Sequence, residues 1–145
     1  MSFSAESLVK MADNRSKYIS EINVNDYVLD MFLKPCKVTK KRVITNCTSY
    51  NISLNNSTGS FYVNKNQLVR SLMTTETGKV LKWDTIEHVF DSESELKSNS
   101  LIKSVNAEIN ISSLNTNTTP RTLYHLTLDN KVKSFFVNNV IVQSQ

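Results

Sequence analysis

The amino-acid sequence predicts an all-β fold. Apolar and polar residues alternate in several short segments, most clearly in residues 50–54 (Tyr-Asn-Ile-Ser-Leu), as expected of strands with one buried face. Polar stretches rich in Asn, Ser and Thr separate these segments, which is typical of turns. Helical periodicity is weak: only residues 83–90, with Ile86, Val89 and Phe90 on one side, are expected to form a turn or two of helix. We therefore expect many short strands.

The first half of the chain contains two strand-turn-strand patterns. Residues 18–22 lead through a polar turn into an apolar run of strand length at residues 27–33. Further on, residues 50–54 and 61–63 flank a turn segment that contains Asn, Ser, Thr and Gly, so we expect them to pair as a hairpin.

The second half changes in composition before it returns to strands. Residues 91–120 are rich in Ser, Asn, Thr and Lys, and we expect a mobile loop with little part in the core, apart from a possible strand at residues 105–111. Residues 122–128 then alternate again, Asp129 and Asn130 form a turn, and residues 135–142 are expected to form two short strands.

Glycine is scarce for a protein with so many turns, since only Gly59 and Gly78 are present. Asn is the next residue to tolerate a left-handed backbone, so several Asn residues are expected where Gly usually lies. The candidates are Asn25, Asn56, Asn130 and Asn139.

Length and composition indicate one domain that would be cytoplasmic and monomeric. The 145 residues with 39% apolar content suffice for a single core. Lys and Arg exceed Asp and Glu by 17 to 13, but they are scattered except at residues 37–42, which we interpret as a solvated edge strand and not as a nucleic-acid site. No apolar run is long enough to span a bilayer, and no signal peptide follows Met1, so no membrane partner is expected. Cys36 and Cys47 are too few for a zinc site and are expected to be buried apolar residues of a reduced protein.

Both ends of the chain carry motifs in a recognisable order. Residues 2–9 read Ser-Phe-Ser-Ala-Glu-Ser-Leu-Val, and residues 22–29 read Ile-Asn-Val-Asn-Asp-Tyr-Val-Leu. Residues 124–128 read Tyr-His-Leu-Thr-Leu, and residues 135–145 read Phe-Phe-Val-Asn-Asn-Val-Ile-Val-Gln-Ser-Gln. In this order they resemble the N- and C-terminal splicing motifs of inteins and related Hint domains, and together they span nearly the whole chain.

The resemblance implies a fold and a reaction. A Hint domain is a flat, horseshoe-shaped β structure in which the two ends meet at the active site. In an intein the first side chain, here Ser2, attacks the preceding carbonyl to form an ester, the first residue after the domain takes over the acyl group, and the last residue, here Gln145, cyclises to release the branch. This is a single-turnover, autocatalytic reaction that requires no cofactor or metal ion. Its partners are the flanking extein sequences of a host protein.

The sequence departs from the intein pattern at several positions. Ser2 is a weaker nucleophile than a thiol, and it could be natural or could replace a Cys. Asn64 and Gln67 stand where the family has Thr and a proton-donating His, and Ser144 stands where it has a second His. Amides and hydroxyls do not transfer protons near neutral pH, so His125 is the expected acid or base of the reaction. The other histidine, His88, matches no motif and is expected to be structural.

Two points of organisation stay open at this stage. Gln143 and Ser144 could align with the family's final His-Asn pair, with Gln145 outside, although Gln145 as the last residue has the carboxamide that cyclisation requires. Residues 91–120 are too few for a homing endonuclease, because folded domains need at least ~50 residues, so the chain would be a mini-intein, either contiguous or naturally split.

Two other functions compete with splicing. The missing histidines are also consistent with a Hint domain that cleaves without ligating, or with a degenerate intein. The modest basic excess is consistent with an all-β binding module that has no catalytic role.

Overall fold

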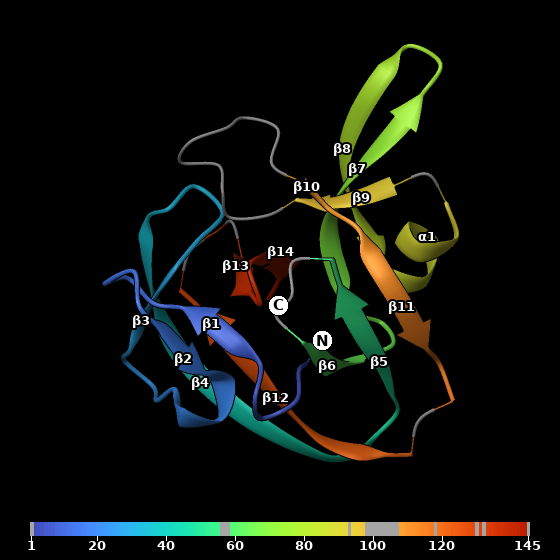
Figure 1. Cartoon of the computed structure of the whole chain (residues 1–145). Coiled ribbons are helices and arrows are strands. Elements are labelled where there is room, and N and C mark those ends of the chain that lie inside the picture. The colour runs from blue at the N-terminus through green and yellow to red at the C-terminus, as the bar shows by residue number, and fades with distance from the viewer. Residues whose placement is uncertain are drawn as a thin grey trace.

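The all-β prediction is confirmed by the computed structural model, which describes residues 2–55, 59–92, 94–97, 108–117, 119–129, 131 and 133–144. Curled antiparallel sheets surround the core, with one short helix at the side (Figure 1). The strands are β1 (Leu8–Lys10), β2 (Ser16–Tyr18), β3 (Tyr27–Leu29), β4 (Pro35–Cys47), β5 (Ser49–Leu54), β6 (Ser60–Asn64), β7 (Leu68–Thr75), β8 (Gly78–Thr85), β9 (Ser94–Lys97), β10 (Glu108–Ile109), β11 (Ile111–Asn115), β12 (Arg121–Leu128), β13 (Ser134–Val137) and β14 (Val140–Gln143). A 3-10 turn, η1 (Ile19–Glu21), follows β2, and the helix α1 (Ile86–Asp91) follows β8.

The largest sheet joins the beginning and the end of the chain. Its order is β10-β9-β7-β14-β13-β1-β2, and β8 pairs with β7 as a long hairpin that projects at the top of Figure 1. Val9 of β1 lies opposite Val137 of β13, and Val142 of β14 lies opposite Val69 of β7. The first strand and the last two strands are therefore neighbours in one sheet.

Two three-stranded sheets, with the orders β12-β4-β3 and β11-β5-β6, complete the described strands. The predicted hairpin of residues 50–54 and 61–63 is confirmed as β5 and β6, with Ile52 opposite Phe61. The expectation of an edge strand at residues 37–42 is wrong for Lys37. This residue has neighbours on both sides, namely Tyr27 of β3 and Asp129. Further along, β4 pairs with β12 alone among the described strands, and Lys40 and Arg42 are exposed there.

One apolar core ties the sheets together. It contains residues from both ends and from the middle of the chain, including Phe3, Val9, Ile52, Leu126 and Phe135. The rings of Phe3 and Phe135 meet edge to face with their centroids 6.0 Å apart. This contact packs the beginning of the chain against the strand that precedes its last turn.

The segment of residues 18–33 is less extended than its apolar pattern predicted. Ile19 and Ile22 are both fully buried because the 3-10 turn between them puts residues three apart on the same side. The strand predicted at residues 27–33 ends at Leu29, since the Asp30 carboxylate accepts hydrogen bonds from the backbone N–H groups of Phe32 (2.8 Å) and Lys34 (3.0 Å) and so stabilises a turn.

A second acidic side chain stabilises the preceding turn. The Asp26 carboxylate accepts a hydrogen bond from the backbone N–H of Asn23 (2.9 Å) and contacts the Lys17 ammonium group (3.3 Å). The hydrogen bond from Asn23 and, to a smaller extent, the Lys17 ammonium group lower the pKa of Asp26 below its ordinary value. Partial burial has the opposite effect but does not cancel them.

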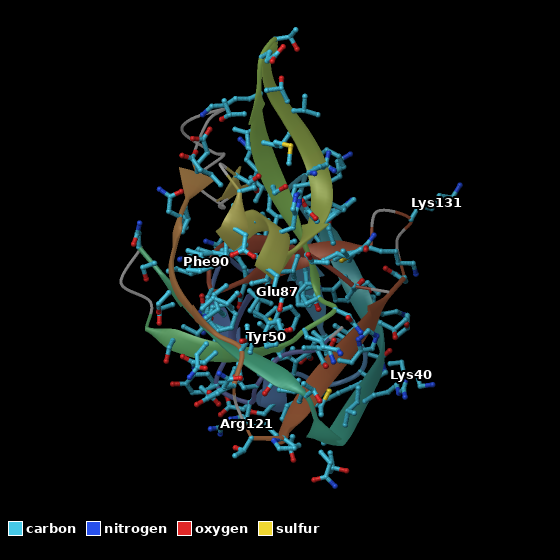
Figure 2. The ribbon with its side chains drawn as sticks, turned by 90° about the vertical axis from the view of Figure 1, so that its right-hand side faces the viewer. Lys40, Tyr50, Glu87, Phe90, Arg121 and Lys131 are labelled. Atoms are coloured by element: carbon cyan, nitrogen blue, oxygen red, sulfur yellow. The ribbon has the colours of Figure 1, made fainter. Side chains whose placement is uncertain are left out.

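The predicted helical turn at residues 83–90 begins later than expected. Trp83 pairs with Arg70 in the β7–β8 hairpin, so that β8 continues to Thr85, whose side chain accepts the backbone N–H of His88 as an N-cap. Figure 2 shows Glu87 of this helix beside Tyr50 of β5, and the Tyr50 hydroxyl donates to Glu87 Oε1 at 2.5 Å. The helix thus covers one edge of the β5 sheet.

Most of the described residues in 91–120 belong to the strands β9, β10 and β11, and these strands contribute to the core. Leu96 of β9 is buried, and Ile109, Ile111 and Leu114 pack against the core. The expectation that this segment adds little to the core is therefore wrong, because its few apolar residues alternate and pair with β7 and β5. Residues 98–107, and with them most of the strand predicted at 105–111, lie outside the described residues.

Asn residues do occupy left-handed backbone positions. Asn25 (φ 78°) and Asn139 (φ 67°) confirm the prediction, and Asn14, Asn46 and Asn138 add to it. Asn56 and Asn130 lie outside the described residues. Among the described residues, no helix has the length and apolar character needed to cross a membrane.

Candidate functional site

The beginning of the chain is inserted between β6 and β12. Phe3 and Tyr124 exchange backbone hydrogen bonds of 2.9 Å and 2.7 Å, and Ser4 donates to the Tyr62 carbonyl at 2.9 Å. Ser2 is consequently buried, with an exposed fraction of 0%, and its carbonyl accepts the backbone N–H of Asn64 at 2.9 Å. An N-terminal residue normally frays in solvent, so this insertion fixes Ser2 at an unusual place.

The end of the described chain is held at the same place. Gln143 ends β14, and its carbonyl accepts a hydrogen bond from Gln67 Nε2 at 2.8 Å. The next residue, Ser144, is buried, and its backbone N–H donates to the Lys133 carbonyl at 2.6 Å. Gln145 lies outside the described residues.

A single turn, residues 64–67, connects the two ends. Asn64 donates its backbone N–H to Ser2, and its carbonyl accepts the backbone N–H of Gln67 at 3.0 Å. Because Gln67 in turn holds Gln143, a continuous chain of hydrogen bonds runs from Ser2 to the last strand.

The side chain of Asn64 is directed into its own turn and not toward Ser2. Its Oδ1 accepts the backbone N–H of Asn66 at 2.8 Å, and its Nδ2 donates to Cys47 Sγ at 3.1 Å. Asn64 therefore contacts Ser2 through its backbone only, among the hydrogen bonds of the described residues. The expectation that Cys47 is a buried apolar residue is wrong, since this thiol is partly exposed and accepts an amide hydrogen bond.

Three buried polar atoms at this place have no hydrogen-bond partner among the described residues. They are Ser2 Oγ, Gln67 Oε1 and Ser144 Oγ. An unpartnered buried polar atom destabilises a fold by about 1–3 kcal/mol, and native structures contain few of them. Two of them belong to residues near the ends of the chain, and the third belongs to the turn that lies between those residues.

The two histidines lie in different environments. His125 is buried on β12, next to Tyr124, whose backbone holds Phe3. His88 is half exposed on α1 and contacts the carboxylate of Asp84, which lies near the end of β8. Its expected structural role stays a prediction. The structure thus brings Ser2, Asn64, Gln67 and Ser144 into one hydrogen-bonded network and places His125 on the adjacent strand.

Two further residues that the sequence did not single out hold the site together. Asn138 lies in the turn between β13 and β14, and its Oδ1 accepts the backbone N–H of Leu8 at 2.8 Å, while its own N–H donates to the Leu8 carbonyl at 2.8 Å. The consecutive Asn residues between two apolar strands were a signal for this turn, but nothing in the sequence indicates that it contacts β1. Cys47 gave no signal at all.

The second cysteine lies in the core. Burial, reinforced by the charges of Asp30 and Asp129, raises the pKa of the Cys36 thiol to about 12. Cys36 therefore matches its predicted role as a buried apolar residue. In the part of the chain that the structure describes, no group of three or more His, Cys, Asp and Glu side chains is placed to bind a metal ion.

Solved structures similar to this chain are inteins. A crystal structure of the gp41-1 intein aligns with 99% of this chain and 98% of that chain, with 17% sequence identity and a TM-score of 0.69. The Ssp DnaB mini-intein variant M86 aligns with 99% of this chain and 93% of that chain, with 16% identity and a TM-score of 0.72. The solution structure of a bacterial intein-like domain from Clostridium thermocellum covers 99% and 98%, with 12% identity and a TM-score of 0.67. No family model and no curated protein matches the sequence.

The chain therefore has the Hint fold of inteins over nearly its whole length. A mini-intein of almost equal extent aligns with 99% of the chain, so the likeness in fold extends over that length. At these identities the likeness establishes the fold, and the chemistry has to be argued from the residues of this chain.

Proposed function

We propose that this chain is an intein that excises itself from flanking polypeptide and joins the two flanks. The observation that carries the proposal is the burial of Ser2 and Ser144, each with an unpartnered hydroxyl, in one hydrogen-bonded network at the centre of the fold. Buried polar atoms without a partner are rare in native structures, and here two of them belong to residues at or near the peptide bonds that splicing would break. A binding module has no need of this arrangement.

In the first step Ser2 Oγ attacks the carbonyl carbon of Met1. The hydroxyl proton is transferred to the Ser2 nitrogen, the C–N bond breaks, and an ester joins Met1 to the Ser2 side chain. The Asn64 and Phe3 backbone bonds fix the Ser2 peptide on the downstream side, so little motion remains except rotation about Ser2 itself. A serine hydroxyl needs help to lose its proton, and His125 on the adjacent strand is the residue we assign to that transfer.

In the last step Gln145 attacks its own backbone carbonyl through its side-chain nitrogen. This closes a six-membered imide and releases the downstream flank, after a nucleophile at the start of that flank has accepted the upstream acyl group. The hydrogen bonds at Gln143 and Ser144 hold the preceding backbone in place for this closure. Ser144, which carries no imidazole, contributes a hydroxyl that can hydrogen-bond but cannot transfer a proton at neutral pH.

The test is to place the chain between two reporter proteins, with a Ser, Thr or Cys as the first downstream residue. Joined reporters together with free domain support splicing. Separated reporters without ligation indicate a Hint domain that only cleaves, and an intact precursor contradicts both functions and leaves the binding module. The Ser2→Ala variant is the matched control, and it should abolish ligation while leaving the melting temperature within about 2 °C.

The role of His125 has a separate test within the same precursor. His125→Ala should slow release of the upstream reporter, since acid-base catalysis contributes about 10²–10⁴-fold where it operates. Normal processing of His125→Ala would remove the acid-base assignment while leaving the splicing function intact.

A further inference from the structure

Gln67 is oriented by its own hydrogen bonds. The side chain is fully buried, and its Nε2 donates to two backbone carbonyls, that of Leu68 at 2.8 Å and that of Gln143 at 2.8 Å. If the amide were rotated by half a turn, Oε1 would face both carbonyl oxygens and both bonds would be lost. One donor therefore points to Gln143 of β14, and the other points to Leu68 of β7.

The group that Gln67 holds is the last peptide group of the described chain that leads into the junction. The carbonyl oxygen of the Gln143–Ser144 peptide accepts Gln67 Nε2, and the N–H of the same peptide donates to the Lys133 carbonyl at 2.6 Å. This peptide is thus fixed from both sides. The backbone is therefore fixed up to the Ser144 nitrogen.

We propose that Gln67 is a positioning residue for the C-terminal junction, and that it does not act on the bond before Ser2, as the resemblance of its sequence position to the intein histidine implied. The proposal rests on the splicing function proposed above. Among the described residues, Gln67 is linked to Ser2 only through the backbone of Asn64, whereas its side chain contacts Gln143 directly.

The chemistry of glutamine suits this role. A neutral carboxamide supplies two N–H donors on one nitrogen at any pH, so it can hold two carbonyls at once. A neutral imidazole carries one N–H and could hold only one of them. The buried Gln67 Oε1, unpartnered among the described residues, remains available as an acceptor for a donor near the junction.

The experiment separates the two cleavages. In a Ser2→Ala precursor only C-terminal release is possible, and in a precursor with Ser2 intact the ester at Ser2 is measured as hydroxylamine-dependent release of the upstream reporter. Gln67→Met keeps the length of the side chain but removes both donors. We expect it to slow C-terminal release at least tenfold and to change the upstream release less than about threefold. Gln67→His should not restore C-terminal release to the wild-type rate.

A pH profile distinguishes positioning from a loss of stability. Gln67→Glu places a carboxylate against two carbonyl oxygens at neutral pH, but once protonated it regains one O–H donor. The C-terminal rate of Gln67→Glu relative to Gln67→Met should therefore rise as the pH falls, at a pH set by the burial-raised pKa of the new carboxyl group. A ratio that does not change with pH overturns the proposal.

One measurement needs no substitution at residue 67. In the Ser2→Ala precursor, the carboxamide protons of Gln67 should exchange slowly with solvent. Fast exchange would overturn the proposal even if every Gln67 variant failed to fold. If the unsubstituted precursor cleaves at neither end, the splicing function fails and this inference fails with it. If it cleaves at both ends and the Gln67 variants lose only the upstream step, this inference alone fails.

Discussion

The turn at Asn138 is the contact that most directly links the last hairpin to β1, and its removal should destabilise the fold measurably. The Leu8 N–H donates to Asn138 Oδ1 at 2.8 Å across 130 positions of sequence. Asn138→Gly keeps the left-handed backbone (φ 48°) without strain but removes the acceptor. A lost hydrogen bond that leaves a partly buried N–H without a partner destabilises a protein by about 1–3 kcal/mol.

The matched control is Asn14→Gly. Asn14 is also left-handed (φ 68°), is exposed, and makes no side-chain hydrogen bond with the described residues. Both substitutions carry the same penalty of a more flexible unfolded chain, about 0.5–1 kcal/mol, so their difference isolates the Leu8 contact. With roughly 2–4 °C per kcal/mol for a domain of this size, Asn138→Gly should melt about 2–12 °C below Asn14→Gly.

Thermal unfolding followed by circular dichroism, with urea unfolding as a second measure, gives both values. Asn138→Asp retains an acceptor oxygen and should recover most of the loss. Equal melting temperatures for Asn138→Gly and Asn14→Gly would refute the reasoning, because the side chain would then contribute nothing to holding the hairpin on β1.

Three other results are expected. Phe3→Ala should lower the free energy of unfolding in urea by about 3–5 kcal/mol, because Phe3 is buried against Phe135. The control Phe32→Ala, at a side chain that is 61% exposed, should change the free energy of unfolding by less than about 0.5 kcal/mol. Similar losses in the two variants would contradict the anchoring role of Phe3. Iodoacetamide at neutral pH should label Cys47 well before Cys36, whose pKa is raised, and should label both in urea; equal native rates would contradict the burial of Cys36. Because the pKa of Asp26 is lower in the folded than in the unfolded chain, its ionised carboxylate stabilises the fold above the unfolded pKa of about 4, and this contribution is lost as the pH falls through the folded pKa. The free energy of unfolding of the wild type should therefore exceed that of Asp26→Asn at about pH 7, and the difference should shrink toward about pH 2.5. A difference that is constant over that range would exclude the effect.

Local patterns in the sequence were sufficient to predict the β5–β6 hairpin and the strand β12. The alternation in residues 50–54 places Ile52 and Leu54 in the core, and the strand predicted at residues 122–128 is β12 with one residue added. In both cases the side-chain period and the adjacent turn determine the structure, and both are visible within ten residues.

The failures come from interactions between distant parts of the chain. Trp83 has a helical pattern around it, but pairing with Arg70 in the β7–β8 hairpin keeps it in a strand. The strands β9 and β11 carry few apolar residues and have a composition typical of loops, and their neighbours in the sheets supply the burial that their own sequences do not indicate. Tertiary pairing overrides weak local preference in each case.

The candidate site was likewise predictable only in part. The resemblance to inteins singles out Ser2, Asn64, Gln67 and Ser144, and hydrogen bonds link the first three of them to Gln143, the residue before Ser144. The direction of each side chain could not be predicted, because it depends on partners such as Cys47 and the Gln143 carbonyl that only the fold brings close. The sequence therefore indicated that Gln67 belongs to the site, but it did not indicate which group the Gln67 carboxamide contacts.

The most direct test of the central claim is to trap the ester at Ser2. A precursor with a reporter fused before Met1 is treated with hydroxylamine, and the mass of the released reporter is measured by mass spectrometry. Neither glycine follows an asparagine, so this chain offers no Asn-Gly bond that hydroxylamine would cleave independently. The account predicts a reporter that ends in the hydroxamate of Met1, present with Ser2 and absent with Ser2→Ala. Release that is unchanged in Ser2→Ala, or no release from a folded Ser2 precursor, would contradict it.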